Sequence, residues 1–212
     1  MSGYGSFDEK GVAAITLLME EKPMFIQTEE TPNPATLKFL PGREVMATGT
    51  AEFRAAEDVS GSPLATRLFG IEGVTGVFFG HDFITVTKAA DKEWHVLKPS
   101  ILGVVMEHFT TGAPVMAAGA ADDGHAAVAE GADSEVVGQI KELLDTRVRP
   151  AVAQDGGDIV FHGFDDGVVT LSMRGACAGC PSSTATLKMG IENMLRYYVP
   201  EVREVRAAEA MY

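Results

Sequence analysis

The chain has 212 residues, a length sufficient for two small domains. Hydrophobic residues make up 46% of it, as is typical of a globular protein. Thirty acidic residues against 17 basic ones leave a net charge of -13, which argues against nucleic acid as a partner. No apolar run is long enough to cross a bilayer, so we expect no membrane partner either.

Residues 1–23 are predicted to be an N-terminal extension. An apolar stretch over residues 12–19 is flanked by acidic residues such as Glu9 and Glu20. A secretory signal begins with basic residues and a transit peptide is poor in acidic ones, so this segment matches neither. Our hypothesis is that translation starts naturally at Met24 and that the extension comes from an upstream start.

Residues 24–111 are predicted to form a compact domain of strands and helices. Hydrophobic alternation, β-branched residues and turn residues indicate five short strands, and Pro63 and helical spacing indicate two helices. The expected strands span residues 24–28, 35–40, 51–54, 74–79 and 83–87. The expected helices span residues 63–69 and 99–109. We find no catalytic constellation in this part of the sequence.

Residues 112–133 are predicted to be a flexible linker. Alanine and glycine dominate this segment, four acidic residues add charge, and it contains no aromatic residue, lysine or arginine. Such a segment buries too little apolar surface to compensate for the entropy lost on ordering.

Residues 134–212 are predicted to form a second domain with the order α-β-β-α-β. An amphipathic helix over 134–153 is followed by a hairpin that turns at 165–167, a helix over 181–198 and an edge strand over 202–205. The first helix is expected to bury one stripe, formed by Val137, Ile140, Leu144, Val148 and Val152. The second is expected to bury Leu187, Ile191, Met194, Leu195 and Tyr198. The predicted fold class is therefore α+β, with two small domains.

The two cysteines of the chain, Cys177 and Cys180, form a single Cys-x-x-Cys between the second strand of this hairpin and the helix that follows. Backbone N–H groups at the start of a helix carry partial positive charge, so we expect them to favour the thiolate form. The flanking Gly175 and Gly179 allow a tight loop. Two cysteines so close together do not make a secreted disulfide framework, which favours a reducing compartment inside the cell.

The residues alone leave three chemistries open for this pair. A thiol–disulfide oxidoreductase also carries its dithiol at a helix start, but only 32 residues follow Cys180, too few for the sheet of that fold. A structural zinc site and an iron–sulfur cluster each need four ligands, so two chains would have to meet at an exposed loop. Covalent haem is excluded because Pro181 stands where that motif needs histidine.

Two separate motifs resemble one known family. The segment from Gln154 to Ile159 reads QDGGDI, and the segment from Gly175 to Ser183 reads GACAGCPSS. Together they resemble the C-terminal domain of NifU-like (Nfu-type) iron–sulfur cluster scaffold proteins. Residues 24–112, which open with MFIQTEETPNPATLK, are similar to the N-terminal domain that precedes it in bacterial and mitochondrial Nfu proteins.

The resemblance implies that Cys177 and Cys180 hold a 4Fe-4S cluster shared by the two protomers of a homodimer. It also implies a carrier that passes this cluster to apo iron–sulfur proteins, receives it from upstream assembly machinery and is not an enzyme. The N-terminal domain is then expected to contact partners or clients. The implied location is the bacterial cytoplasm, or the mitochondrial matrix if the protein is eukaryotic.

Overall fold

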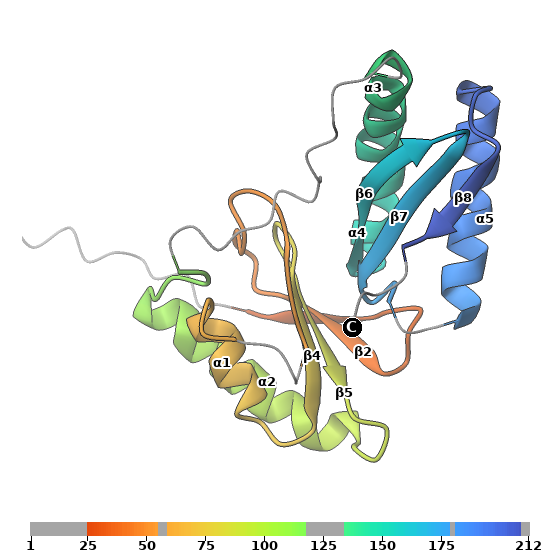
Figure 1. Ribbon diagram of the computed structural model, residues 1–212. Helices are drawn as coiled ribbons and strands as arrows, with labels where there is room; N and C mark the ends of the chain where they lie inside the picture. The colour runs from red at the N-terminus through yellow and green to blue at the C-terminus, as the bar shows by residue number, and fades with distance from the viewer. Residues whose placement is uncertain (1–24, 55–58, 118–133, 179–180, 209–212) are drawn as a thin grey trace, which may run out of the picture.

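The computed structural model describes residues 25–54, 59–117, 134–178 and 181–208 (Figure 1). The predicted N-terminal extension, Met24, most of the predicted linker, and Gly179 with Cys180 lie outside the described residues.

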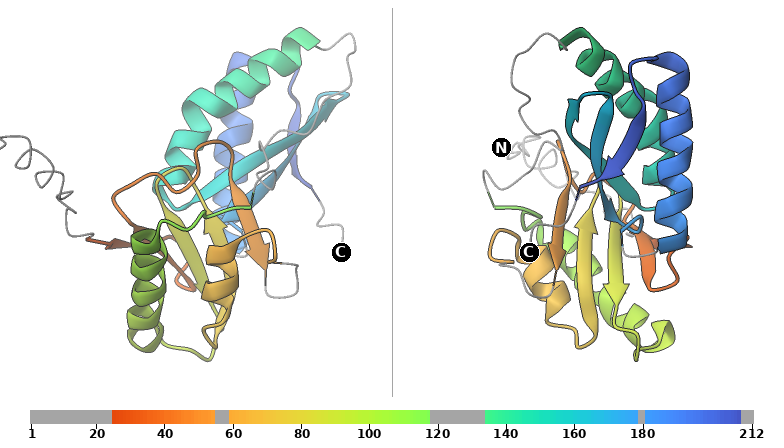
Figure 2. Two further views of the ribbon diagram at one scale, coloured as in Figure 1. Left: turned by 90° about the vertical axis from the view of Figure 1, so that its left-hand side faces the viewer. Right: turned by 45° about the vertical axis from the view of Figure 1, so that its right-hand side comes forward.

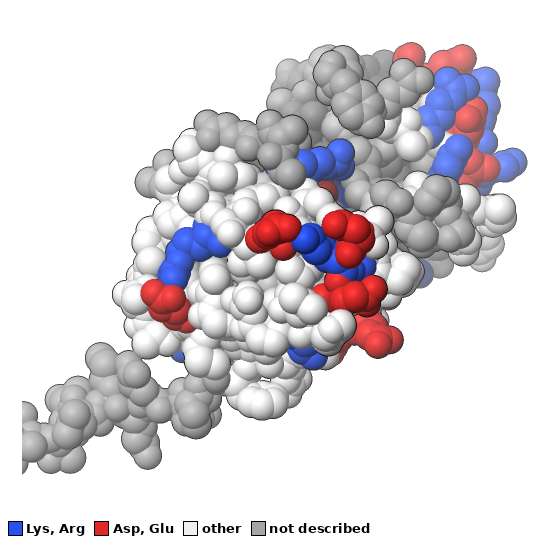
Figure 3. All heavy atoms as spheres, turned by 90° about the horizontal axis from the view of Figure 1, so that it is seen from below, with Lys and Arg blue, Asp and Glu red and all other residues white. Residues whose placement is uncertain are grey.

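Within the described part, no helix is both long and apolar enough to cross a membrane. On the face shown in Figure 3, acidic and basic side chains are mixed rather than separated by sign.

The N-terminal unit is a five-stranded antiparallel sheet with two helices on one face (Figures 1 and 2). Its strands lie in the order β1-β2-β5-β4-β3. They are β1 (Gln27–Glu30), β2 (Thr36–Leu40), β3 (Ala51–Arg54), β4 (Val74–Phe79) and β5 (Ile84–Lys88). The helices are α1 (Pro63–Phe69) and α2 (Trp94–Thr111). Every second side chain on a strand, such as Phe39 on β2 and Phe79 on β4, points towards the helices and joins the core.

The bounds of α1 agree with the prediction, whereas α2 begins five residues before the predicted start at Pro99. Ser62 caps α1, because its Oγ accepts a hydrogen bond from the Ala65 N–H at 3.0 Å. In α2 the Trp94 indole donates to the Pro34 carbonyl at 3.0 Å, and Leu97 is buried in the core. These tertiary contacts hold the early turns, so Pro99 lies inside the helix.

The predicted linker begins with residues that belong to the N-terminal unit. The Ser62 Oγ donates to the Val115 carbonyl at 2.5 Å, and the Ala117 N–H donates to the Gly61 carbonyl at 2.8 Å. Val115 and Met116 also pack against the core of this unit. The structure therefore attaches the chain as far as Ala117, and the rest of the predicted linker lies outside the described residues.

The C-terminal unit has the predicted order α-β-β-α-β, so the α+β class is confirmed. The first helical rod consists of α3 (Ser134–Leu143), a π-helical turn η1 (Leu144–Val148) and α4 (Arg149–Gln154). The remaining elements are β6 (Gly157–Asp165), β7 (Val168–Gly175), α5 (Pro181–Tyr198) and β8 (Glu204–Ala207). The sheet order is β6-β7-β8, with β8 parallel to β7. The π-helical turn ends two residues before Pro150, which has no N–H to continue the regular helical bonding.

The core of this unit lies between the helices and one face of the sheet. All five predicted residues of the first helical stripe are buried, as are Ile191 and Leu195 of α5. The prediction for Tyr198 was wrong, because its side chain is 44% exposed and lies 4.6 Å from the Arg147 guanidinium. The neighbouring Val199 fills the core at this level instead.

Candidate functional site

Cys177 lies in the turn that connects β7 to α5. The turn begins at Gly175, whose φ of 62° is the left-handed conformation that favours glycine. The Ala178 N–H donates to the Gly175 carbonyl at 3.1 Å. The Thr184 hydroxyl donates to the Cys177 carbonyl at 3.1 Å and so joins the turn to the first part of α5.

Gly156, which precedes β6, and Gly157, its first residue, form a cradle for this turn. The Gly156 carbonyl accepts a hydrogen bond from the Ala176 N–H at 3.1 Å. A Cβ atom on Gly157 would lie 2.6 Å from the Cys177 Sγ and 2.7 Å from the Arg174 carbonyl oxygen. Both glycines belong to the QDGGDI segment that carried the family resemblance. Its glycines also allow the cysteine turn to approach the backbone closely.

Asp158 anchors the same region through a charged contact. Its carboxylate accepts from Arg149 Nε and Nη2, each at 3.0 Å, and from the Thr50 hydroxyl at 3.1 Å. Asp158 is buried, so a bidentate partner of opposite charge is what allows the carboxylate to remain there. Asp158 therefore has a structural role beside Cys177.

The ionisation of Cys177 differs from the prediction. Burial, together with the negative charges of Asp155 and Asp158, raises the pKa of the Cys177 thiol to about 11. The predicted preference for thiolate is therefore wrong for Cys177 in this conformation. The physical reason is that this thiol is 6% exposed and lies four residues before α5, so burial outweighs any effect of the helix start. Cys180 lies outside the described residues.

Residues of the N-terminal unit reach the cysteine turn. Glu52 on β3 accepts a hydrogen bond from the Gly175 N–H at 3.1 Å. The Asn33 side-chain amide donates to the Ala178 carbonyl at 3.4 Å. In the part of the chain that the structure describes, no three His, Cys, Asp or Glu side chains gather into a possible metal site.

Comparison with known proteins agrees with these two units. A family model described as the N-terminal domain of the scaffold protein Nfu/NifU matches residues 26–112, and the NifU-like domain matches residues 140–206. The human protein "NFU1 iron-sulfur cluster scaffold homolog, mitochondrial" is 52% identical over 183 residues, which cover 86% of this chain and 71% of the relative. This chain belongs to the Nfu family of scaffold proteins.

Other Nfu relatives are similar to a comparable degree. "NifU-like protein 4, mitochondrial" of Arabidopsis thaliana is 53% identical over 191 residues, which cover 88% of this chain and 66% of that protein. The chain thus spans about two thirds of the length of this plant relative. A solution structure of a NifU-like protein from Saccharomyces cerevisiae is 25% identical and aligns with a TM-score of 0.42, covering 45% of this chain and 86% of that one.

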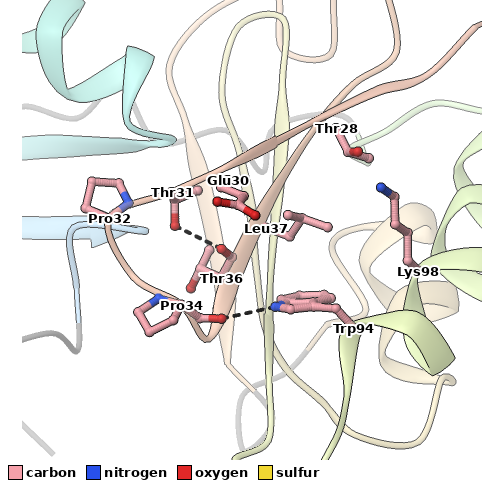
Figure 4. Close-up of a pocket in the computed structure, with 9 residues that line it drawn as sticks. All are labelled: Thr28, Glu30, Thr31, Pro32, Pro34, Thr36, Leu37, Trp94 and Lys98. Atoms are coloured by element: carbon pink, nitrogen blue, oxygen red, sulfur yellow. Dashed lines mark hydrogen bonds between the residues drawn. The ribbon is translucent and has the colours of Figure 1, made fainter.

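The Nfu-type N-terminal unit also has a pocket of about 570 Å³ between the β1–β2 edge and the start of α2 (Figure 4). In Figure 4, Trp94 and Lys98 of α2 lie on one side and Glu30 on the other. Its lining residues are Thr28, Glu30, Thr31, Pro32, Pro34, Thr36, Leu37, Trp94 and Lys98. The sequence of the Thr31–Pro34 segment did not indicate that it borders a pocket.

Sequence reasoning missed the residues of the N-terminal unit that contact the cysteine turn. In the sequence, Asn33 stands between two prolines, and Glu52 lies in the predicted strand over residues 51–54. Nothing in their local pattern indicates a partner more than a hundred residues away. Only the alternation on β3, which points Glu52 away from the helices, could have suggested that this face has a partner.

Proposed function

We propose that the protein is a scaffold and carrier of a 4Fe-4S cluster, bridged between two protomers through Cys177 and Cys180 of each chain. The main support is the Cys-x-x-Cys at the β7–α5 turn of a chain that belongs to the Nfu family. In this role the cluster is cargo that the protein delivers to apo iron–sulfur proteins, and the protein is not an enzyme.

Counting ligands supports a shared site. A 4Fe-4S cluster is usually held by four cysteine thiolates, and each chain has two cysteines. Two chains that meet with their cysteine turns therefore supply one full set of thiolate ligands. A two-fold symmetric homodimer does this with one and the same surface on each chain.

A shared site also favours transfer. Half of the ligands belong to each protomer, so separating the protomers weakens the hold on the cluster. Incoming thiolates of a client protein would then replace Cys177 and Cys180 one after the other. The N-terminal unit would hold the client, and residues 118–133, the rest of the predicted linker, would raise the local concentration of the cluster near it.

The names of the relatives support a location. The Arabidopsis and human relatives are both named as mitochondrial proteins. We propose that the protein acts in the mitochondrial matrix in a eukaryote, and in the cytoplasm in a bacterium.

Anaerobic reconstitution with iron and sulfide tests the proposal. We expect about four iron and four acid-labile sulfide per dimer, with a broad brown absorbance. Cys177→Ala and Cys180→Ala should each abolish cluster binding while leaving the far-ultraviolet circular dichroism of the apo-protein unchanged. A cluster retained by Cys180→Ala would contradict a site built from two cysteines per chain.

Two other functions remain as outcomes of this experiment. A structural zinc dimer would be colourless and would dissociate with a chelator. A thiol–disulfide oxidoreductase would reduce insulin and bind no iron.

A further inference from the structure

We propose that the N-terminal sheet has a docking face for the cysteine turn of its own chain, and that docking excludes the bridged cluster. The docking face is the side of the sheet opposite α1 and α2, represented by Lys38 on β2, Glu52 on β3, Phe78 on β4 and Thr85 on β5. The part of this inference that concerns the cluster rests on the proposed function.

The docking face is defined by strand alternation. Phe78 lies between the core residues Val77 and Phe79, and Thr85 lies between Ile84 and Val86. Because successive side chains of a strand point to opposite faces, Phe78 and Thr85 point away from the helices. In Figure 1 the C-terminal unit lies on this side of the sheet.

Burial shows that the docking face is covered. Phe78 and Thr85 are each 1% exposed and Lys38 is 6% exposed, although none of them belongs to the core between the sheet and the helices. Lysine is rarely buried without partners. The Lys38 ammonium donates to the Gln154 carbonyl at 3.0 Å and pairs with Glu29 at 3.2 Å. The C-terminal unit therefore supplies the acceptor that a buried Lys38 needs.

Two glycines of the C-terminal unit allow its backbone to approach the docking face closely. A Cβ atom on Gly156 would lie 2.8 Å from the Thr85 methyl group, and one on Gly175 would lie 3.0 Å from the Phe78 ring. Both glycines have positive φ, at 82° and 62°. The backbone that shapes the cysteine turn thus lies directly against the docking face.

Polar contacts surround Cys177 on both sides. Glu52 accepts from the N–H of Gly175, two residues before the cysteine, and Asn33 donates to the carbonyl of Ala178, one residue after it. A second protomer must bring its own cysteine turn to this same end of the domain to complete the ligand set. The two occupants compete for one surface, so the docked chain is the apo form and the cluster-bridged dimer needs undocking.

Lys38 provides a direct probe of docking in the full-length protein. Acetylation of its amine can be followed peptide by peptide by mass spectrometry, with the half-buried Lys98 of α2 as an internal reference. In the apo-protein we expect Lys38 to react slowly. Reconstitution with iron and sulfide should increase the acetylation rate of Lys38 about tenfold or more, because the C-terminal unit no longer covers it. The acetylation rate of Lys98 should not change.

A matched pair of variants separates docking from the cluster. Phe78→Arg places a charge on the docking face and should expose Lys38 in the apo-protein, whereas Thr75→Arg, at an exposed position of the same strand, should not. Circular dichroism checks that each variant is folded. If Phe78→Arg fails to fold, Thr85→Glu replaces it, since Thr85 lies on the same face outside the core.

Each outcome has a separate meaning. If Lys38 reacts equally fast in the wild-type apo-protein and in the folded docking-face variant, docking is wrong whatever the cluster does. If Lys38 stays protected after loading, docking stands but the exclusion is wrong. If protection falls on dilution, the occupant is a second copy and docking within one chain is wrong. If no protein binds iron, the proposed function fails, and the apo comparison still decides docking.

Discussion

Gly157 and the Cys177 sulfur lie so close together that no residue larger than glycine fits at position 157. A Cβ atom at position 157 would be 2.6 Å from Sγ and 2.7 Å from the Arg174 carbonyl oxygen, and the second of these atoms belongs to the backbone. A side chain can change rotamer to avoid a clash, but the β6–β7 pairing holds the backbone in place. The position of the cysteine turn thus depends on a glycine twenty residues away.

Replacing this glycine should therefore disturb the site. We expect Gly157→Ala to destabilise the C-terminal unit by about 1–3 kcal/mol, because the cysteine turn and the end of β7 must move. Urea unfolding followed by circular dichroism measures the change. Gly163→Ala on the same strand is the matched control, since among the described residues only its chain neighbours come within 4 Å of its Cβ position. A cost as large as that of Gly157→Ala would contradict the steric explanation.

The Arg149–Asp158 pair should also stabilise the region beside the site. We expect Arg149→Ala to cost about 2–3 kcal/mol, because it leaves the buried Asp158 carboxylate without its cationic partner. Thermal unfolding measures the loss. Arg206→Ala removes an arginine from an exposed pair with Glu204 and should leave the melting temperature unchanged. Equal effects of the two substitutions would show that burial does not determine the strength of the Arg149 pair.

Helix α5 contains an exposed glycine, Gly190. Apart from the backbone of its own helix, no atom of the described residues lies within 4 Å of its Cβ position. We expect Gly190→Ala to stabilise the C-terminal unit by about 0.5–1 kcal/mol, since alanine loses less backbone entropy on entering a helix. The midpoint of urea unfolding should rise. A lower midpoint would mean that this position has a contact that alanine disturbs.

The Cys177 thiol should titrate late. In apo Cys180→Ala, ultraviolet absorbance of the thiolate should give a midpoint near 11 rather than at the ordinary value of 9.0. The unfolded chain releases this proton at the ordinary pKa of 9.0. The contribution of Cys177 to the free energy of unfolding is therefore fully present below pH 9.0 and is lost as the pH rises towards 11. The double variant Cys177→Ser, Cys180→Ala should lack this loss. A midpoint below 9.0 would contradict burial as the dominant cause.

Local patterns predicted most of the elements. The bounds of β3, β4, α1 and α5 agree with the prediction, because capping residues, prolines and strict alternation are all read within a few residues. The hairpin turn also agrees, since Asp166 and Gly167 adopt the positive φ that their residue types favour. The start of α2 was missed because Trp94 and Leu97 are held by contacts with distant parts of the chain.

Residue type and spacing were enough to predict the two-unit α+β order, the family and the two cysteines as the candidate ligands. The surroundings of Cys177 could not be predicted in this way. Its burial, its raised pKa and the contacts of Glu52 and Asn33 with its turn all depend on residues brought together by folding. Local sequence carries the preferences of the backbone, but desolvation and long-range hydrogen bonds arise only when distant segments pack against one another.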